Sequence, residues 1–417
     1  MTEVRHDCLT RRGGRSVSVS ELSTMEGRSA RSLWRFAENE TQLNHGSFGG
    51  VPVTVLETQR HLKDAMEADP VRWFCELPER IVRARLDIAS ILGAPEDSLA
   101  LVPNASGGMS VLFSSLMGHG PINVATTNHG YGAVVMGAQR LARRSGGTAV
   151  TVNLPLGGSD SDVVALVEQA LTDHSINLLV IDQITSATAR QFPIDQICDV
   201  AHARNCIVAV DGAHAPGVLD RPIVEKADVW VGNLHKFWCA PRGSAVLVLN
   251  NHDLDLAPLI DSWGALQPFP SRFDYQGTLD VTSWLAAPAA WRYLESSIGW
   301  GRIRSYSARL ADYAVDLCAD ALKRLGVPTP VPDVGRPTGP IRLLSIPRRP
   351  GNRPWDHDAV DALRIPFLNA SGIALAFTEF DGEGYMRIST HAYNTASDAE
   401  TLAHHGIPIL ADLIRQL

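Results

Sequence analysis

The sequence lacks the marks of several protein classes. Its six cysteines are widely spaced and form no C-x-x-C pair, so neither a disulfide framework nor a zinc site is expected. Its apolar runs are too short for a membrane span, which takes roughly 18–20 residues. It contains no block of Lys and Arg, so we expect neither nucleic acid nor a membrane surface as a partner.

What the composition does provide is material for a folded core. The chain has 417 residues, of which 45% are hydrophobic and 20% charged, and 37 Lys and Arg against 45 Asp and Glu give a net charge of −8. This balance indicates a soluble globular protein with two to three domains, at about 150 residues per domain.

The first thirty residues differ from the rest. Residues 1–30 are rich in Arg and Ser and have no apolar centre of the kind found in secretory signals. We expect a disordered tail over this range and a reducing, cytoplasmic location for the protein.

Short apolar runs alternate with amphipathic stretches between about residues 98 and 250. Most runs are apolar at successive positions, which is typical of strands covered by helices on both faces. The pattern predicts an α/β fold around a mostly parallel seven-stranded sheet. The predicted strands are Leu99–Pro103, Ile122–Ala125, Thr148–Val152, Leu178–Asp182, Ile207–Asp211, Val229–Gly232 and Ala245–Leu249.

The pattern changes after Thr278. Trp284–Leu325 is nearly continuous helix pattern, interrupted near Gly299, and a shorter α+β pattern follows a Pro-rich stretch. We therefore predict a large domain over residues 31–284 and a smaller C-terminal domain over 285–417. The segment before residue 45 is expected to pack on the smaller domain or on a partner subunit.

Two residues at predicted strand ends indicate a cofactor. Asp211 ends one apolar strand, and Lys236 follows another within Gly232–Trp238. Ligands of such sheets bind beyond the carboxyl ends of the strands. Pyridoxal phosphate needs a lysine amine, a carboxylate for its ring nitrogen and a phosphate cradle at a helix N-terminus. Asn104, Ala105 and Ser106, between a strand and a helix pattern, provide the cradle.

Seven short motifs resemble those of the fold-type I pyridoxal-phosphate enzymes of aminotransferase class V, in the branch of isopenicillin N epimerase. They span residues 43 to 391 in the order of the family. The motifs are LNHGSFG at 43–49, PNAS at 103–106, HGYGA at 129–133, VDGAHAP at 210–216, HKFW at 235–238, QGT at 276–278 and MRISTH at 386–391.

The resemblance implies a role for each matching residue. Lys236 would form the Schiff base with the cofactor, and Asp211 would pair with the pyridine nitrogen. Arg387 would bind the substrate carboxylate, with Asn44 and Ser47 nearby in the substrate site. The remaining cofactor residues are His214 and Ser186 at the phenolic oxygen, Asn104, Ala105, Ser106 and His235 at the phosphate, Thr278 at the phosphate of the neighbouring subunit of a homodimer, and His129 stacked on the ring with Tyr131 close by.

The chain also departs from the family. At 186–191 it reads SATARQ, where relatives place an apolar residue at the position of Arg190, which is either a substrate-recognition charge or a loop residue. His45 fills a position where epimerases often lack a histidine. The sequence has no cysteine after Cys318, which disfavours the persulfide chemistry of cysteine desulfurases.

The expected reaction begins with removal of the Cα proton of an amino acid by Lys236. We favour β-elimination from an S-substituted cysteine, a C–S lyase reaction of secondary metabolism such as antibiotic biosynthesis. The alternatives are epimerisation, with Tyr131 or a histidine such as His45 as the second acid, and decarboxylation-coupled deamination or transamination. A non-catalytic protein on the same fold is the rival from another class. A nucleotide-binding oxidoreductase is disfavoured because no G-x-G-x-x-G follows the first strand.

Overall fold

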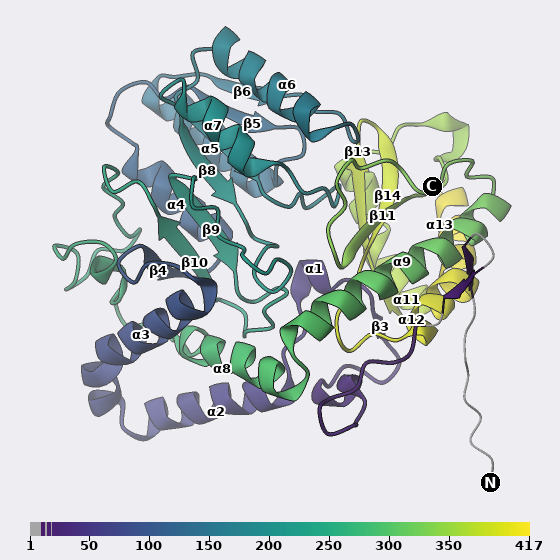
Figure 1. Cartoon of the computed structure of the whole chain (residues 1–417), viewed down its shortest axis with the longest axis horizontal. Coiled ribbons are helices and arrows are strands. Elements are labelled where there is room, and N and C mark those ends of the chain that lie inside the picture. Colours follow the sequence, from purple (N-terminus) through teal and green to yellow (C-terminus); the bar gives the residue numbers. More distant parts are fainter. Residues whose placement is uncertain (1–9, 13–14, 18) are drawn as a thin grey trace. The chain divides into compact units, whose positions relative to one another are not determined.

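The computed structural model describes residues 10–12, 15–17 and 19–417. The chain forms two compact units (Figure 1). The large unit comprises Gly50–Ser186 and Arg190–Tyr293. The small unit comprises the described residues up to Gly49, together with Ala187–Ala189 and Leu294–Leu417.

The large unit is built on a seven-stranded sheet. The strand order is β4-β10-β9-β8-β7-β5-β6, and β10 runs antiparallel to both of its neighbours while the other pairs are parallel. The predicted α/β fold with a mostly parallel sheet is therefore confirmed. The strands are β4 (Leu99–Val102), β5 (Val124–Thr127), β6 (Ala149–Val152), β7 (Leu178–Asp182), β8 (Ile207–Asp211), β9 (Val229–Asn233) and β10 (Ala245–Leu249).

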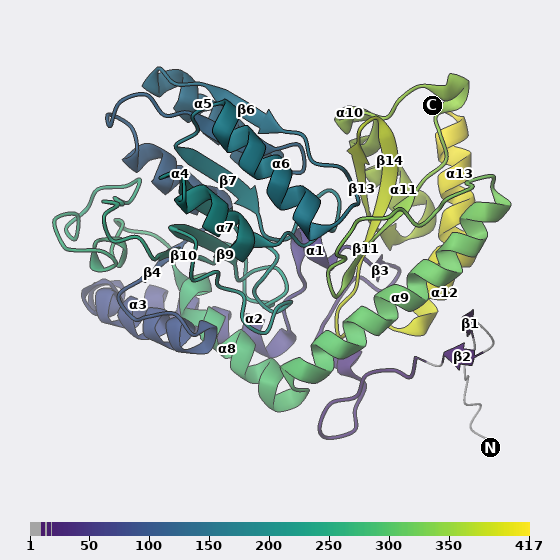
Figure 2. The same ribbon diagram turned by 45° about the horizontal axis from the view of Figure 1, so that its top comes forward.

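Helices cover both faces of this sheet. Helices α4 and α5 lie on one face, and α6 and α7 lie on the other (Figure 2). Because both faces are covered, every residue of β4, β7, β9 and β10 is buried. The helices that lie wholly within this unit are α2 (Val53–Ala68), α3 (Pro70–Leu92), α4 (Ala105–Ser115), α5 (Gly132–Ser145), α6 (Asp160–Asp173), α7 (Ile194–His202) and the short η2 (Ser271–Phe273).

Local sequence sets where several of these helices begin and end. Asp69 caps α3, with Pro70 at the first helical position, and Ser159 forms a capping box with Asp162 at the start of α6. Helix α5 ends at Gly146, whose φ of 82° is the left-handed conformation that favours glycine.

The small unit contains an antiparallel sheet in the order β11-β14-β13, formed by β11 (Ile341–Ser345), β14 (Glu383–Ser389) and β13 (Ala376–Phe380). Two short strands, β3 (Thr41–Gln42) and β12 (Ile373–Ala374), pair in parallel. The other elements are β1 (Thr10–Arg12), β2 (Arg15–Val17), η1 (Ala30–Leu33), α1 (His45–Phe48), α9 (Trp300–Arg324), η3 (Pro350–Asn352), α10 (His357–Asp361), α11 (Arg364–Ser371), α12 (Ala396–Thr401), η4 (Leu402–Gly406) and α13 (Ile407–Arg415).

The long helical pattern after Thr278 forms two helices. Helix α8 (Thr282–Ser297) ends just before Gly299, whose φ is 92°, and α9 begins at Trp300. The interruption predicted near Gly299 is confirmed. The change from large to small unit falls within α8, between Tyr293 and Leu294, while the predicted boundary lies at residue 284.

The N-terminal segment belongs to the small unit. Residues 1–9, 13–14 and 18 of the predicted tail lie outside the described residues. From residue 19 onward the chain is packed rather than tail-like: Leu22 and Ala30 are buried, and the Ala30 N–H donates to the Leu22 carbonyl at 2.8 Å. The Arg- and Ser-rich composition of residues 1–30 gives no indication that these two apolar residues are buried.

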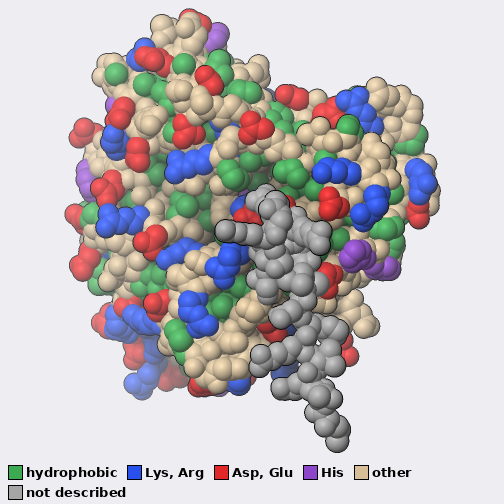
Figure 3. All heavy atoms as spheres, turned by 45° about the vertical axis from the view of Figure 1, so that its right-hand side comes forward, with side chains coloured by type: hydrophobic (Ala, Val, Ile, Leu, Met, Phe, Trp, Pro, Cys, Tyr) green, Lys and Arg blue, Asp and Glu red, His purple; other side chains and the backbone are tan. Residues whose placement is uncertain are grey.

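The surface carries charges of both signs. On the face drawn in Figure 3, acidic and basic side chains are interspersed. Among the described residues, the helices are too short or too polar to cross a bilayer. The expected lack of nucleic-acid and membrane partners stays a prediction.

Candidate active site

Lys236 lies in the turn that follows β9. Its Nζ is 3.1 Å from Nε2 of His214, which comes from the segment after β8. The imidazole of His214 is buried, so its ring is held by its surroundings. The contact therefore joins two side chains that follow neighbouring strands of the sheet, β8 and β9.

Asp211, the last residue of β8, is buried beside it. Its Oδ1 accepts the N–H of Ala213 at 2.9 Å. Burial raises the pKa of Asp211 above its ordinary value, while the Ala213 N–H and the positive charge of Lys236 lower it. A protonated ring nitrogen placed against this carboxylate would stabilise its charged form in the same way.

Asp182 is a second buried carboxyl, which the sequence analysis missed. It ends β7 and is the register partner of Asp211 on the neighbouring strand. Burial, and then the negative charge of Asp211, raises the pKa of Asp182 well above its ordinary value, although the N–H of Tyr131 donates to it. Of the two acids, Asp182 therefore has the more strongly raised pKa. The signal that identified Asp211, an aspartate at the end of an apolar strand, was also present here.

The turn from β4 into α4 is the segment predicted to bind the phosphate. Oδ1 of Asn104 accepts the N–H of Gly107 at 2.8 Å and caps the helix. The N–H of Ala105 donates to Oδ1 of Asn233 at 2.9 Å, so this amide is already engaged within the protein. Phosphate binding by Ala105 and Ser106 stays a prediction. No local signal could have found Asn233, which lies 128 residues away from its partner.

A glycine lets the cradle helix approach the sheet. A Cβ on Gly108 would lie 2.7 Å from Cγ1 of Val231 in β9, closer than side-chain carbons approach one another. A larger residue at position 108 would push the first turn of α4 away from the strand that leads to Lys236.

His129 lies in the turn between β5 and α5. It is 1% exposed, and its Nε2 lies 3.2 Å from the carbonyl oxygens of both Leu154 and Pro155. Burial lowers the pKa of His129 to about 4, so the ring is neutral at neutral pH. Tyr131, two residues later, is 46% exposed.

The other predicted cofactor residues are spread over the large unit. Nδ1 of His235 donates to the Ser244 carbonyl at 3.0 Å, and burial lowers the pKa of His235 to about 4. Ser186 is half-buried, and Thr278 is exposed. The cofactor contacts of His235, Ser186 and Thr278 stay predictions.

Arg387, in β14, is a buried arginine of the small unit. It is 3% exposed, and its Nη2 donates to Ser47 Oγ at 2.7 Å and lies 3.4 Å from Asn44 Oδ1. Burial, and then the positive charge of Arg364, lowers the pKa of Arg387 to about 10. A ligand carboxylate would relieve this destabilisation of the guanidinium charge.

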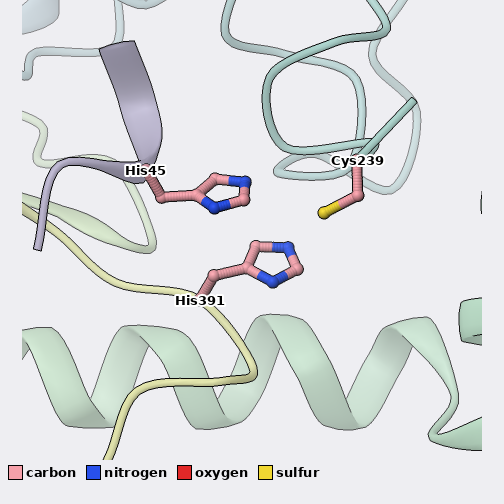
Figure 4. A group of neighbouring side chains, drawn as sticks. All are labelled: His45, Cys239 and His391. Atoms are coloured by element: carbon pink, nitrogen blue, oxygen red, sulfur yellow. The ribbon is translucent and has the colours of Figure 1, made fainter. Parts of the chain in front are cut away.

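His45 is buried in the same unit. Its Nδ1 lies 3.0 Å from the hydroxyl of Tyr393, and its ring stacks on His391 with centroids 4.1 Å apart and an interplanar angle of 15° (Figure 4). Cys239, also labelled in Figure 4, belongs to the large unit. His391 and Tyr393 were not predicted as site residues, although His391 ends the MRISTH motif.

Arg190 is not a substrate-facing charge on the surface. The side chain is fully buried, and its guanidinium donates to the backbone carbonyls of the loop after β6. Of the two roles left open by the sequence, the loop role is the one that the contacts favour.

The described cysteines show no sign of activation. Cys198, Cys206, Cys239 and Cys318 are buried, and burial raises the pKa of each thiol. Cys75 is exposed on α3. Because a thiolate is the reactive form, the four buried residues are poor nucleophiles.

Comparison with known proteins supplies a family. Residues 51–330 match the family model described as aminotransferase class-V. Isopenicillin N epimerase of Streptomyces clavuligerus is 29% identical over 380 residues, which cover 87% of this chain and 92% of that protein. The L-cysteine desulfhydrase of Arabidopsis thaliana is 26% identical over 68% of this chain and 69% of its own length.

Solved structures show the same fold. The cystine C–S lyase C-DES, solved with its reaction product cysteine persulfide, has a TM-score of 0.72 and 18% identity over 90% of this chain and 98% of its own. A variant of C-DES was solved with glycine covalently linked to its pyridoxal-phosphate cofactor. At this identity the likeness concerns the fold alone, and it confirms the predicted fold type.

Proposed function

Because the chain belongs to the aminotransferase class-V family, we propose that it is a pyridoxal-phosphate enzyme that cleaves the C–S bond of an S-substituted cysteine by β-elimination. Membership confirms the expected cofactor and enzyme class, whereas the reaction and substrate are our proposal. The observation that carries it is the contact between Lys236 and His214 beside the buried carboxylate of Asp211.

The polar residues of the large unit fit the cofactor. When bound, pyridoxal phosphate draws the electrons of a broken Cα bond into its ring. Lys236 would hold the cofactor covalently, and Asp211 would keep the ring nitrogen protonated. Ser106 and His235 would bind the phosphate. The buried carboxylate, the nearby amine and the capped N-terminus of α4 are the groups that this cofactor requires.

Lys236 is the proposed base that takes the Cα proton of the substrate. Its Nζ is held by Nε2 of His214, which limits the positions that the amine can adopt. A base held in one place removes the proton without first losing conformational freedom.

Arg387 is the proposed anchor for the substrate carboxylate. Its guanidinium is fixed by Ser47 and has a planar fork that matches a carboxylate. Because the carboxylate is held, the Cα–H bond would be the one presented to Lys236. Asn44 and Ser47 would orient the arginine and the substrate.

Two observations support release of a thiol rather than transfer of sulfur to the protein. The sequence has no cysteine after Cys318, and the four buried cysteines have raised thiol pKa values. Relatives named L-cysteine desulfhydrase and a neighbour named as a C–S lyase are consistent with this chemistry. We also propose a homodimer, a cytoplasmic location and a role in secondary metabolism.

The test is to incubate the holoenzyme with a panel of cysteine thioethers and other L-amino acids in deuterated water. We expect free thiol, pyruvate and ammonia in equal amounts from a thioether. Carbon dioxide without pyruvate would show that the carboxylate, rather than the Cα hydrogen, leaves, and would contradict the role given to Arg387.

Epimerisation is the second candidate. The similarity to isopenicillin N epimerase extends over 87% of this chain, and His45, beside the Asn44 and Ser47 contacts of Arg387, is a buried acid or base. A D-isomer formed without pyruvate would favour this reaction. In that case His45→Gln would abolish epimerisation, whereas a C–S lyase with the same substitution would still release thiol.

A further inference from the structure

Arg190 is held by the backbone carbonyls of a short loop. Nη1 donates to the carbonyl oxygens of Pro155 at 3.0 Å, Leu156 at 3.1 Å and Gly157 at 2.6 Å, and Nη2 donates to that of Gly158 at 3.0 Å. One fully buried guanidinium therefore fixes four consecutive residues between β6 and α6. Only arginine has enough N–H groups in a fixed fork to do so.

The same loop holds His129. The carbonyls of Leu154 and Pro155 both face Nε2 of His129 at 3.2 Å, and Pro155 also accepts from Arg190. Phe192 contacts both side chains: its ring lies edge-on to His129 at 5.3 Å and beneath the Arg190 guanidinium at 5.3 Å. Arg190, the loop and Phe192 thus form one support around the imidazole.

We propose that Arg190 is a positioning residue for His129, which it holds through residues 154–158 in one orientation and one tautomer. Because the loop offers only acceptors, Nε2 must carry the hydrogen, and Nδ1 keeps its lone pair. The part of this inference that concerns stacking of His129 on the cofactor rests on the proposed function.

The positive charge of Arg190 also acts on His129 directly. It lowers the pKa of His129, in addition to the larger effect of burial, whereas the hydrogen bonds to the Leu154 and Pro155 carbonyls raise that pKa. Two titratable carboxyl groups also lie near this support: Asp162 on α6, which interacts with Arg190, and Asp182, which accepts the Tyr131 N–H. A neutral ring is the form that can lie against a cationic pyridine ring without repulsion.

The test compares Arg190→Leu, Arg190→Lys and Arg204→Leu in the apoprotein and the holoenzyme. Leucine removes every donor, and lysine keeps the charge but cannot reach four carbonyls. Arg204 is the control because it is a partly exposed arginine of the same unit, paired with Glu168. Nitrogen NMR of the imidazoles reports the tautomer, with the His129 signal assigned from its loss in His129→Gln.

We expect the His129 signal of the apoprotein to show a single Nε2–H tautomer in the parent and in Arg204→Leu. In Arg190→Leu it should become a tautomer mixture, and loss of the nearby positive charge should raise its pKa above about 4. Arg190→Lys should lie between the two. The holoenzyme of Arg190→Leu should lose cofactor about five- to tenfold more readily, as expected for a weakened ring contact.

An unchanged tautomer and pKa of His129 in a folded Arg190→Leu would overturn the proposal. If that variant fails to fold, the same readouts on Arg190→Lys decide. The NMR measurement on apoprotein needs neither substrate nor turnover. A wrong reaction would therefore leave the Arg190 result intact, and a failure of the Arg190 result would leave the reaction untouched.

Discussion

The two units of this protein place their functional side chains in different ways. In the large unit, Asp182 and Asp211 are the last residues of neighbouring parallel strands, and Lys236 follows the next strand. In the small unit, Arg387 lies within an antiparallel strand and is held by Ser47, which is 340 residues away in the chain. The first arrangement is a consequence of sheet topology, whereas the second depends on a long-range contact.

Because of this difference, we expect mutations in the two units to affect different steps of the reaction. The large unit holds the proposed cofactor groups, so damage there should act mainly on the chemical step. The small unit holds the proposed substrate anchor, so damage there should act mainly on substrate binding. Substitutions in each unit test whether this division is correct.

Lys236→Ala should have the largest effect. Loss of the proposed base should lower turnover by about 10⁴-fold, the upper end for a general base. Borohydride should fix the cofactor to the parent protein and leave the variant unmodified. The control is Lys226→Ala, which removes an exposed lysine paired with Asp199 and should leave turnover unchanged. Full activity in Lys236→Ala would show that another residue binds the cofactor.

Arg387→Ala should raise KM far more than it lowers kcat. A buried guanidinium–carboxylate contact is worth about 2–5 kcal/mol, or a loss of about 30- to several thousand-fold in kcat/KM. Arg348→Ala is the control, because this exposed arginine pairs with Glu383 at the start of the same strand. A lowered kcat with an unchanged KM would contradict the assignment of substrate binding to the small unit.

Asp211→Asn should lower kcat by about 30- to 10³-fold, the equivalent of 2–4 kcal/mol of transition-state stabilisation. The reason is loss of the charge that keeps the ring nitrogen protonated, while the amide oxygen can still accept from Ala213. Folding, followed by circular dichroism, should be little changed. A wild-type rate in this variant would contradict the role of the strand-end carboxylate.

Asp182→Asn should have little effect on kcat but a clear effect on the pH dependence of stability. A carboxyl whose pKa is raised in the folded state binds a proton that the unfolded chain has released above its ordinary pKa of 3.8. It therefore stabilises the folded state at low pH, and this stabilisation is lost as pH rises, at up to about 1.4 kcal/mol per pH unit. Denaturant unfolding of the apoprotein at several pH values should show that this contribution is missing in the variant. Equal slopes in variant and parent would mean that Asp182 is charged.

Thr278 gives the smallest expected effect. If Thr278 reaches the phosphate of a partner subunit, Thr278→Val should weaken cofactor binding by about fivefold, as for one lost hydrogen bond of about 1 kcal/mol. Dilution to monomer should also release cofactor, as measured by absorbance after gel filtration. A monomer that retains its cofactor would contradict a shared site.

The sequence predicts the large unit better than the small one for a physical reason. The strands that are covered on both faces appear as apolar runs. All seven predicted strands lie within two residues of the observed ones, including β6, which is only partly buried. Asp211 and Lys236 then follow from their places at strand ends. Asp182 could have been found by the same reasoning and was missed.

Other contacts have no local signature. The hydrogen bond from Ala105 to Asn233 and the stack of His45 on His391 join residues that meet only after folding. The buried position of Arg190 was also beyond the sequence, since an arginine in a loop is usually exposed. The backbone carbonyls that it satisfies become visible only in three dimensions.

The hydrogen bond between Ala105 and Asn233 makes local opening between α4 and β9 measurable. It joins the first amide of the helix at the proposed phosphate cradle to the last residue of the strand before Lys236. The Ala105 amide hydrogen therefore exchanges with solvent when this hydrogen bond breaks, either because the Asn233 side chain rotates or because the end of β9 separates from α4. Its exchange rate would report how often the contact between the two proposed anchoring points of the cofactor is lost, and a bound cofactor that spans both should slow that exchange.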